Sequence, residues 1–441
     1  MSPTFASLKV FNYRLWAGGA IVSNTGTWMQ RVAQDWLVLT ELTDHSAVAV
    51  GITTGLQFGP MLLLGPFAGV LADRLPKRFL LMVTQGLMGF WSLILGLLVV
   101  TGTAQLWHVF VLAGLLGATA AVDAPARQTF VAEMVPEDKL SNAVGLNSAS
   151  FHAGRLLGPA VAGLLIALVG TGPVFMINAV TFMATLLSLT QMRVRELLAT
   201  KKAPREKGQV REGLRYVRGR PDIMLVMAIV GMVGTFGLNF QMTTALMATS
   251  VYDKGAGEYG LLGSIMAIGS LAGALLAARR ARPRLRLLVG ATAAFGVLAT
   301  ASALMPTYEL FALSLIPVGL SSLTLMTAAN TRVQLSTEPE MRGRVMALYM
   351  AIFMGGTPIG APLIGVIGET FGARYTILLG GVVSMLVAVV AAVYVVRSRD
   401  LHVRYRLLER PHLLVEDPAV TREETRRRLA SDDARNAATA A

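Results

Sequence analysis

The sequence predicts an all-α integral membrane protein with twelve transmembrane helices in two six-helix pseudo-repeats. Of its 441 residues, 54% are hydrophobic and only 15% are charged, whereas soluble domains carry about 25% charged residues. A helix needs about 20 apolar residues to cross a bilayer, and the chain has twelve runs of that kind. They are expected at 15–41, 47–70, 79–101, 106–124, 142–169, 173–191, 223–250, 259–278, 287–304, 308–329, 345–367 and 375–396.

Lysine and arginine residues are concentrated in alternate connecting segments. Nearly all of the 39 lie in the terminal segments and in the loops on the same side, while the opposite loops hold only Lys254 and Arg374. Because cytoplasmic loops carry the excess of positive charge, both termini are expected in the cytoplasm, with the chain multi-pass in a bacterial cytoplasmic (inner) membrane. The same pattern accounts for the net charge of +13, so the lipid bilayer, and not nucleic acid, is the expected partner.

Catalytic and metal-binding patterns are not evident in the sequence. The chain has no cysteine, which excludes disulfides, thiolate metal ligands and cysteine nucleophiles. None of its five histidines has the spacing of a zinc-binding helix, and no phosphate-binding loop or nucleophile–base pair stands out. We therefore expect neither an enzyme nor a metal or cofactor site, with a membrane receptor or enzyme as the less favoured alternative.

A long basic segment divides the chain in the middle. The predicted parts are an N-terminal six-helix bundle (1–191), a cytoplasmic linker (192–222), a C-terminal six-helix bundle (223–396) and a charged cytoplasmic tail (397–441). Within the linker, EGLRYVRGRPDI predicts an amphipathic helix on the membrane surface. Leu214 and Val217 are expected to face inward, and the arginines at 211, 215 and 218 the headgroups. The tail is expected to be partly helical or disordered.

Glycines recur at a constant offset of 202 residues between the two bundles. The pairs are Gly117 and Gly319, Gly154 and Gly356, Gly158 and Gly360, Gly163 and Gly365, and Gly170 and Gly372. Parallel repeats related by an axis along the membrane normal form one large class of transporters. The register of these glycines therefore predicts two repeats of one six-helix unit.

Two motifs resemble those of the major facilitator superfamily. The run GVLADRLPKR, from Gly69 to Arg78, is similar to the loop motif G-x-L-A-D-R-x-G-R-K of that superfamily, with Pro76 in place of the loop glycine. The run GRLLGPAVAG is similar to the antiporter motif G-x-x-x-G-P-x-x-G-G of its exporters, with Ala162 in place of one glycine. The antiporter-like positions are Gly154, Gly158, Pro159 and Gly163.

Five further stretches resemble one branch of that superfamily, the branch of the enterobactin exporters and macrolide efflux permeases. They are NYRLW, DAPARQTFVAEMVP, GRLLGPAVAGLL, EGLRYVRGRPDI and MRGRVMALY. The resemblance implies export of small, often amphipathic molecules, drug or siderophore-like, by proton antiport with alternating access. The proton gradient would supply the energy, and a monomer is expected. Because a fold does not name its substrate, an uptake permease for a small metabolite stays an alternative.

The loop motif implies a gate on the cytoplasmic side. The gate residues are Gly69, Asp73, Arg74, Lys77, Arg78 and Asp123. Asp73 is expected to face the start of the eleventh span, near Arg344, because helix N-termini favour negative charge. By the resemblance, Lys77 or Arg78 would pair with Asp123. Ordinary topogenic charge would also explain Lys77 and Arg78.

The first span carries a polar stripe. Asn24, Thr27, Arg31 and Asp35 are spaced by three and four residues and share one helix face, with Gln34 beside them. A charge in the middle of a membrane has to face water or a partner, and Asp35 is the carboxylate placed well inside a span. We expect Asp35 to be the proton-coupling group with Arg31 as its neighbour. A structural ion pair near the outer headgroups is the alternative.

Two basic side chains in the fifth span are further candidates for coupling. His152 and Arg155 are three residues apart and share a face. Arg155 would either attract an anionic substrate or pair with Asp35 across the bundle.

A polar and apolar mixture in the seventh span suggests a cavity wall. Phe236, Asn239 and Gln241 are the candidates there, beside methionines at 232 and 242. Soft apolar walls with a few hydrogen-bonding groups suit varied amphipathic ligands. Asn24, Thr27 and Gln34 are the corresponding candidates in the first span, and packing against lipid is the alternative.

Overall fold

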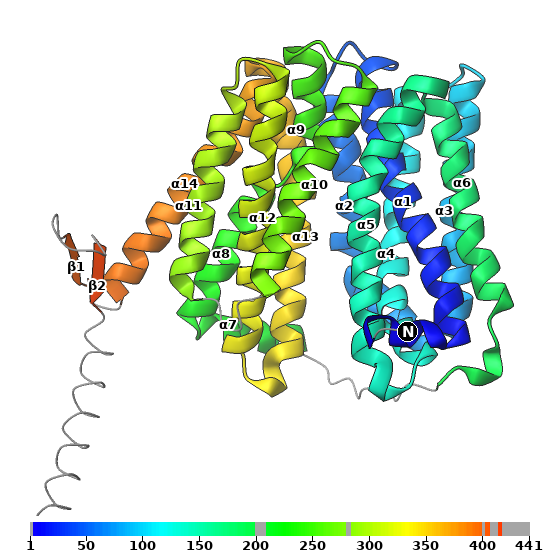
Figure 1. The fold of residues 1–441 in the computed structure, drawn as a ribbon, viewed down its shortest axis with the longest axis horizontal. Coiled ribbons are helices and arrows are strands. Elements are labelled where there is room, and N and C mark those ends of the chain that lie inside the picture. Colours follow the sequence, from blue (N-terminus) through cyan, green and yellow to red (C-terminus); the bar gives the residue numbers. More distant parts are fainter. Residues whose placement is uncertain (1–2, 199–208, 279–283, 399–401, 406–412, 417–441) are drawn as a thin grey trace, which may run out of the picture. The chain divides into compact units, whose positions relative to one another are not determined.

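The apolar runs fold as long helices in the computed structural model, which describes residues 3–198, 209–278, 284–398, 402–405 and 413–416 (Figure 1). The chain forms two compact units, Met1–Met385 and Leu386–Ala441. The first unit opens with a 3-10 helix, η1 (Pro3–Lys9). The helices of the first half are α1 (Phe11–Thr40), α2 (Ala47–Arg74), α3 (Lys77–Val100), α4 (Leu106–Met134), α5 (Glu137–Val169) and α6 (Thr171–Gln191).

A short 3-10 turn and one amphipathic helix lead to the second half. These are η2 (Val194–Glu196) and α7 (Gln209–Arg218). The second half consists of α8 (Pro221–Phe236), α9 (Phe240–Leu246), the π-helical turn η3 (Met247–Val251), α10 (Ala256–Ala278), α11 (Leu285–Ala303), α12 (Tyr308–Ser336), α13 (Pro339–Phe371) and α14 (Ala373–Ser398). Two strands follow, β1 (His402–Tyr405) and β2 (Leu413–Glu416).

Eleven helical segments in the described ranges are long and apolar enough to cross a membrane. They correspond to eleven of the twelve predicted runs. The remaining run, 15–41, lies in α1, which has 30 residues but is more polar because it carries Arg31, Gln34 and Asp35. The seventh predicted span is interrupted: α8 ends at Phe236, α9 begins at Phe240, and η3 completes the segment. The apolar pattern of this span did not indicate the interruption.

A buried cluster of apolar side chains lies inside the first half, near its chain start. Trp16 and Phe130 pack edge to face, with ring centroids 5.7 Å apart. The Tyr13 hydroxyl donates to the backbone oxygen of Ala143 at 2.7 Å, so this large residue is buried with its polar atom satisfied. α1, α4 and α5 are thereby held together at one end of the half.

The paired glycines make corresponding contacts in the two halves. Gly117 of α4 packs against the backbone of α2 at Gln57, and Gly319 of α12 against the backbone of α10 at Met266. Because a glycine lacks a Cβ, two helix backbones can approach closely at such a position. The pair therefore fixes the same neighbour relation, fourth helix on second helix, in each half.

The next pairs repeat this correspondence. Gly154 and Gly158 pack on α1, at Asn24 and Trp28, while Gly356 and Gly360 pack on α8 at Thr235. Gly170 and Gly372 both adopt positive φ angles, of 80° and 104°, where α5 turns into α6 and α13 into α14. A positive φ favours glycine, which explains why this residue stands at both turns.

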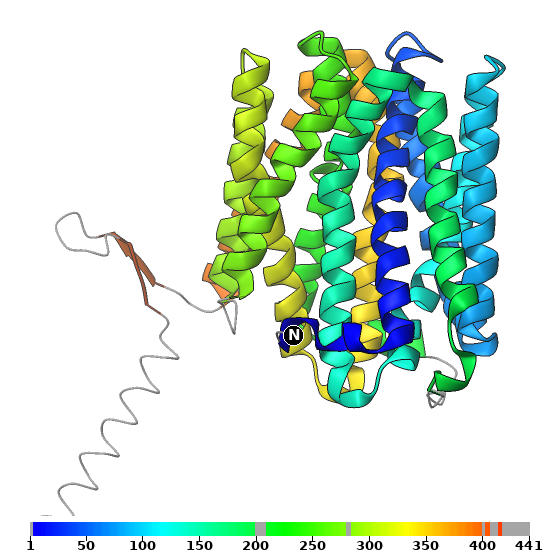
Figure 2. The same ribbon diagram turned by 45° about the vertical axis from the view of Figure 1, so that its right-hand side comes forward.

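The two halves meet along a seam formed by α2 with α13 and by α5 with α10. We call the end of the helices that holds η1 and α7 the η1 end, and the other the 41–46 end (Figures 1 and 2). Among its contacts, Gly365 of α13 meets Ala47 at the 41–46 end, and Gly355 meets Leu62 nearer the middle of the helices. Between α10 and α5, the Ser264 hydroxyl donates to the backbone oxygen of Leu156 at 3.2 Å.

The linker helix differs from its prediction in one respect. α7 packs on α13, with Val217 buried and Gly213 close to the Arg344 side chain. Leu214, expected to face inward, is 39% exposed. Gly213, which has no side chain, takes the position that faces α13. Leu214, the next residue, therefore points outward, while Val217 stays buried.

The described parts of the tail are strands, which differs from the helical or disordered expectation. β1 and β2 pair antiparallel, with His402 opposite Glu416. Runs of four residues are too short to show strand periodicity in a sequence. The predicted boundaries of the bundles, linker and tail stay predictions.

Candidate functional site

The expected pairing of Lys77 or Arg78 with Asp123 is wrong for this arrangement. Lys77 forms an ion pair with Glu133, near the end of α4. Arg78 donates to the backbone oxygen of Leu189 at 2.7 Å, at the end of α6. Both residues stand in the first turn of α3, so their side chains reach the ends of neighbouring helices. Both cations therefore tie the first half together internally.

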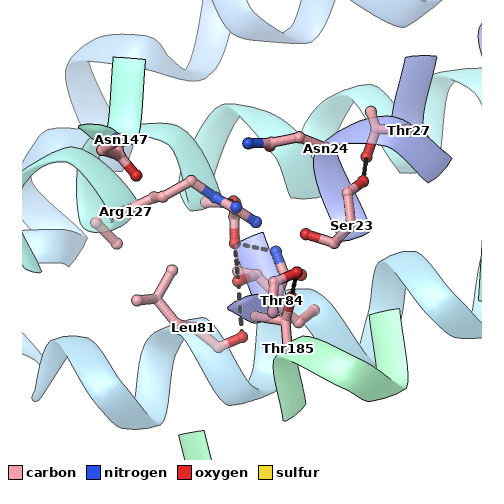
Figure 3. A network of polar contacts seen from close by, with 12 residues as sticks. Ser23, Asn24, Thr27, Leu81, Thr84, Arg127, Asn147 and Thr185 are labelled. Atoms are coloured by element: carbon pink, nitrogen blue, oxygen red, sulfur yellow. Dashed lines mark hydrogen bonds and ion pairs between the residues drawn. The ribbon is translucent and has the colours of Figure 1, made fainter. Parts of the chain in front are cut away.

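Asp123 belongs to a buried network within the first half (Figure 3). Its Oδ1 accepts hydrogen bonds from Thr84 Oγ1 at 2.7 Å and Gln85 Nε2 at 2.8 Å. Its Oδ2 accepts from Arg127 Nε at 3.0 Å, one turn along α4. The Arg127 guanidinium lies over the Trp16 ring, 5.3 Å from its centroid. The carboxylate is thus fully engaged between α3 and α4.

The remaining gate residues lie at the η1 end of α2. Gly69 and Asp73 are in the last turns of this helix, and their side-chain surroundings lie outside the described residues. Arg74, the last residue of α2, is exposed. Arg344, near which Asp73 was expected, pairs with Glu212 of α7 at 2.7 Å. The gate role of Asp73 stays a prediction.

The antiporter-like motif places α5 between two helices. Gly154 and Gly158 approach α1, as described above, while the backbone oxygen of Pro159 lies against Gly260 of α10. Gly163 approaches α10 at Ala256, so a Cβ there would clash with backbone atoms. One face of the motif therefore packs on α1 of the same half, and the other packs on α10 across the seam.

Asp35 is buried, and the hydrogen bond that it accepts crosses between the halves. Its Oδ2 accepts from Gln241 Nε2 of α9 at 2.9 Å, while its Oδ1 is buried without a hydrogen-bond partner among the described residues. The Tyr259 hydroxyl of α10 donates to the backbone oxygen of Gln241 at 3.1 Å. The Tyr259 ring stacks on Trp36, with centroids 6.0 Å apart. A carboxylate of the first half is thus held by the second half.

The two expected ion pairs of Asp35, with Arg31 or with Arg155, are not formed among the residues that the structure describes. Instead, both guanidinium groups lie over the Trp28 ring, with Cζ 4.7 Å and 5.4 Å from its centroid. Side chains on a helix lean toward its N-terminus, so Arg31 reaches back toward Trp28 and away from Asp35. The side chain of His152 lies outside the described residues.

The polar cavity candidates have the following partners. In α1, Asn24 Nδ2 donates to Ser150 Oγ at 3.3 Å, Thr27 Oγ1 to the Ser23 backbone oxygen at 2.8 Å, and Gln34 Oε1 accepts from Gln57 Nε2 at 3.1 Å. Figure 3 includes Asn24 and Thr27 and draws the hydrogen bond between Thr27 and Ser23. Gln34 Nε2 is buried without a partner among the described atoms.

The break between α8 and α9 encloses a small cavity. Phe236 and Asn239 are among its lining residues, with Thr243 and Thr376. Asn239 Nδ2 donates to the backbone oxygen of Thr235 at 2.7 Å, which satisfies one carbonyl freed by the break. Gln241 faces Asp35 and does not line this cavity. Two of the three candidates of this span, Phe236 and Asn239, line the small cavity, and the third, Gln241, contacts Asp35.

Sequence reasoning missed a contact at the 41–46 end of the seam. Glu369, near the end of α13, accepts hydrogen bonds from Ser46 Oγ and from the Val48 backbone N–H, both at 3.2 Å. These donors stand at the N-terminus of α2, where free N–H groups favour a carboxylate. In the sequence, a serine suited to an N-cap position, Ser46, was the available sign that a helix N-terminus lies here. The α13 partner could not be known from the sequence.

Comparisons with known proteins agree with the motifs. Residues 2–417 match the family described as "Transmembrane secretion effector". The multidrug efflux pump Tap of Mycolicibacterium fortuitum is 28% identical over 394 residues, covering 87% of this chain and 95% of its own. The enterobactin exporter EntS of Shigella boydii serotype 18 is 26% identical over 364 residues, covering 80% and 86%.

Solved structures show the same fold. A bacterial homologue of the human lysosomal transporter Spinster, in an inward-facing and unoccupied conformation, aligns with a TM-score of 0.65 and 14% identity, over 89% of this chain and 96% of its own. The resemblance expected from the motifs is thereby confirmed. The chain belongs to the transmembrane secretion effector family, an exporter branch of the major facilitator superfamily, whose members are transporters and not enzymes.

Proposed function

We propose that this protein exports small amphipathic molecules, drug or siderophore-like, by proton antiport with alternating access. Relatives named as a multidrug efflux pump and an enterobactin exporter support export. We further propose that α1 is the twelfth span and that the twelve form two six-helix pseudo-repeats, which the corresponding glycine contacts support. The η1 end would be cytoplasmic, with both termini there, in a bacterial inner membrane. A monomer without cofactor or nucleic-acid partner completes the proposal.

The observation that carries the coupling is the hydrogen bond between Asp35 and Gln241. It joins the two halves at the 41–46 end, where Glu369 also bridges them. An ionised carboxylate loses hydration when it is buried, and here the Gln241 donor of the opposite half replaces part of that hydration.

Separation of the halves at the 41–46 end would remove Gln241 from Asp35 and admit water. The carboxyl group would then exchange its proton with the outer side, and closure would restore the present contacts. Proton exchange and access to substrate would share one motion, as antiport requires.

The test begins with a drug and siderophore susceptibility panel in an efflux-deficient host, with a protonophore control. The flux of a compound against which the protein protects the host is then measured in proteoliposomes with and without an imposed pH gradient. Asp35→Asn should lose the response to the gradient and retain exchange of substrate in its absence. The control is Asp138→Asn, an exposed acid at the start of α5, which should behave as the parent.

A full response of Asp35→Asn to the gradient would make Asp35 structural. Sensitisation of the host, in place of protection, would instead favour the uptake permease.

The cytoplasmic gate has its own test. Asp73→Asn should insert normally and lose transport, with increased labelling of cysteines placed along α4 and α12 from the cytoplasmic side. Asp138→Asn is the matched control, since Asp138 is an exposed acid at the start of α5 and lies outside the loop motif. Transport by Asp73→Asn at the rate of the parent would remove the essential role of that charge.

A further inference from the structure

Two arginine side chains share one tryptophan ring near the middle of the first half. Arg31 Cζ lies 4.7 Å from the Trp28 centroid and also 4.6 Å from that of Phe58. Arg155 Cζ lies 5.4 Å from the Trp28 centroid. Neither guanidinium makes an ion pair or a conventional hydrogen bond to the described part of the chain. A ring face attracts the cation but takes none of the five N–H donors of each arginine.

The position of this cluster is accessible. Arg155 is exposed although it stands midway along α5. The next residue, Leu156, accepts a hydrogen bond from Ser264 of α10 through its backbone oxygen. A charged group midway along a membrane helix has to face water or a partner, since lipid cannot solvate it. Arg155 therefore stands beside the seam with its side chain open to water or to a ligand.

Aromatic faces complete the cluster. The Phe151 ring packs edge to face on Trp28, with centroids 5.8 Å apart, and Phe151 remains 46% exposed. Phe58 is half-buried beside Arg31. Two positive charges with unused donors thus stand among three aromatic rings, on α1, α2 and α5. Asp35, one turn along α1, attracts the Arg31 charge but forms no ion pair with it, and its hydrogen bond is to Gln241.

We propose that Trp28, Arg31, Phe58, Phe151 and Arg155 bind the substrate, and that this substrate is an anion with a flat aromatic body. The guanidinium groups would donate to its carboxylate, and charge-assisted hydrogen bonds of this kind are strong and specific. The aromatic rings would pack on its apolar part. This assignment rests on the proposed transport function and specifies the chemical class that the transporter accepts.

Three probes of one shape and different charge test the assignment. They are 1-naphthoate, neutral 1-naphthamide and cationic 1-naphthylmethylammonium, measured by equilibrium dialysis against the full chain in nanodiscs. The parent should bind naphthoate about tenfold or more tighter than the other two, the effect of one charged hydrogen bond. Arg155→Gln and Arg31→Gln should each remove most of this preference, so that naphthoate binding falls toward that of naphthamide.

Two variants separate charge from general damage. Arg286→Gln removes an exposed arginine at the start of α11, far along the chain from the cluster, and should bind all probes as the parent does. Phe58→Leu should weaken all three probes alike, because it removes aromatic contact and no charge.

Equal binding of the three probes by the parent would overturn the assignment, as would an unchanged preference in Arg155→Gln. The parent measurement alone decides the matter if a variant fails to fold. Failure of the transport proposal is distinguishable. Arginine-dependent naphthoate binding without flux of any compound would leave this site standing and remove transport. Flux of a cation without naphthoate binding would leave transport standing and overturn this site.

Discussion

The two halves share one packing frame and differ in the charges placed on it. In the first half, α4 carries an ion pair between the buried Asp123 and the partly buried Arg127. At the offset of 202 residues, α12 carries Leu325 and Ala329, both fully buried. One glycine pair, Gly117 and Gly319, positions α4 and α12 against the second helix of each half. Backbone approach is thus set by the small residues, while the interior next to them accepts either a satisfied polar network or apolar side chains.

The same contrast holds for the candidate site. Arg155 of α5 corresponds at that offset to Thr357 of α13. The second half instead contributes the break between α8 and α9, which positions Gln241 against Asp35. The charged groups of the site therefore come from one half, and the irregular backbone that meets them comes from the other.

The largest expected effect comes from exchanging the α4 pair for its α12 counterpart. Asp123→Leu alone should lower the free energy of unfolding by about 3–5 kcal/mol, because it leaves the Arg127 charge buried and unpaired. The double variant Asp123→Leu, Arg127→Ala copies the second half and should recover much of that loss. The measurement is the thermal unfolding midpoint in detergent, with Leu325→Val as a control for mild repacking in α12. A double variant no more stable than the single one would show that the halves need different interiors here.

A smaller effect is expected at the corresponding glycines. A Cβ at Gly158 would lie 2.5 Å from the Trp28 Cβ, and one at Gly360 would lie 1.7 Å from the Thr235 backbone oxygen. Alanine at either position should cost about 1–3 kcal/mol by overpacking, with the greater loss at Gly360, where backbone has to move.

The matched controls for these glycines are Gly145→Ala and Gly343→Ala, since a Cβ at either meets nothing within 4 Å. Both should leave the unfolding midpoint unchanged or raise it, because alanine favours a helix. A loss at one of Gly158 and Gly360 without a loss at the other would break the correspondence between the halves.

The smallest effect is expected at Glu369. Glu369→Gln weakens its contact with the N-terminus of α2 by about 0.3–1 kcal/mol, which changes the ratio of closed to open forms by about two- to fivefold. A cysteine placed beside Asp35 at the 41–46 end should then be labelled faster from the outer side. The control is Glu340→Gln, an exposed acid at the other end of α13. Unchanged labelling in Glu369→Gln would show that the contact does not hold this end closed.

The spanning helices could be predicted because crossing a bilayer requires a contiguous apolar run of about 20 residues, which can be found in the sequence alone. Apolar runs of spanning length placed eleven segments that the structure confirms, and the GVLADRLPKR run indicated the superfamily. The break after Phe236 escaped because it removes only residues 237–239 from the helix, inside the stretch Pro221–Val251 that is apolar enough to span as one segment. α1 lies outside this set of eleven because Arg31, Gln34 and Asp35 make it more polar than the others.

The sequence by itself determined the helices, the superfamily and the residue types that carry charge inside them, since each depends on composition and spacing along one segment. Only the tertiary structure decided the partners. Lys77 contacts Glu133 and Asp35 contacts Gln241, neither of which follows from spacing. Arg31 turns to Trp28 because helical side chains lean toward the N-terminus, and the ring of Phe58 from α2 meets it there. Which groups meet is a property of helix packing, and packing joins residues that lie far apart in the chain.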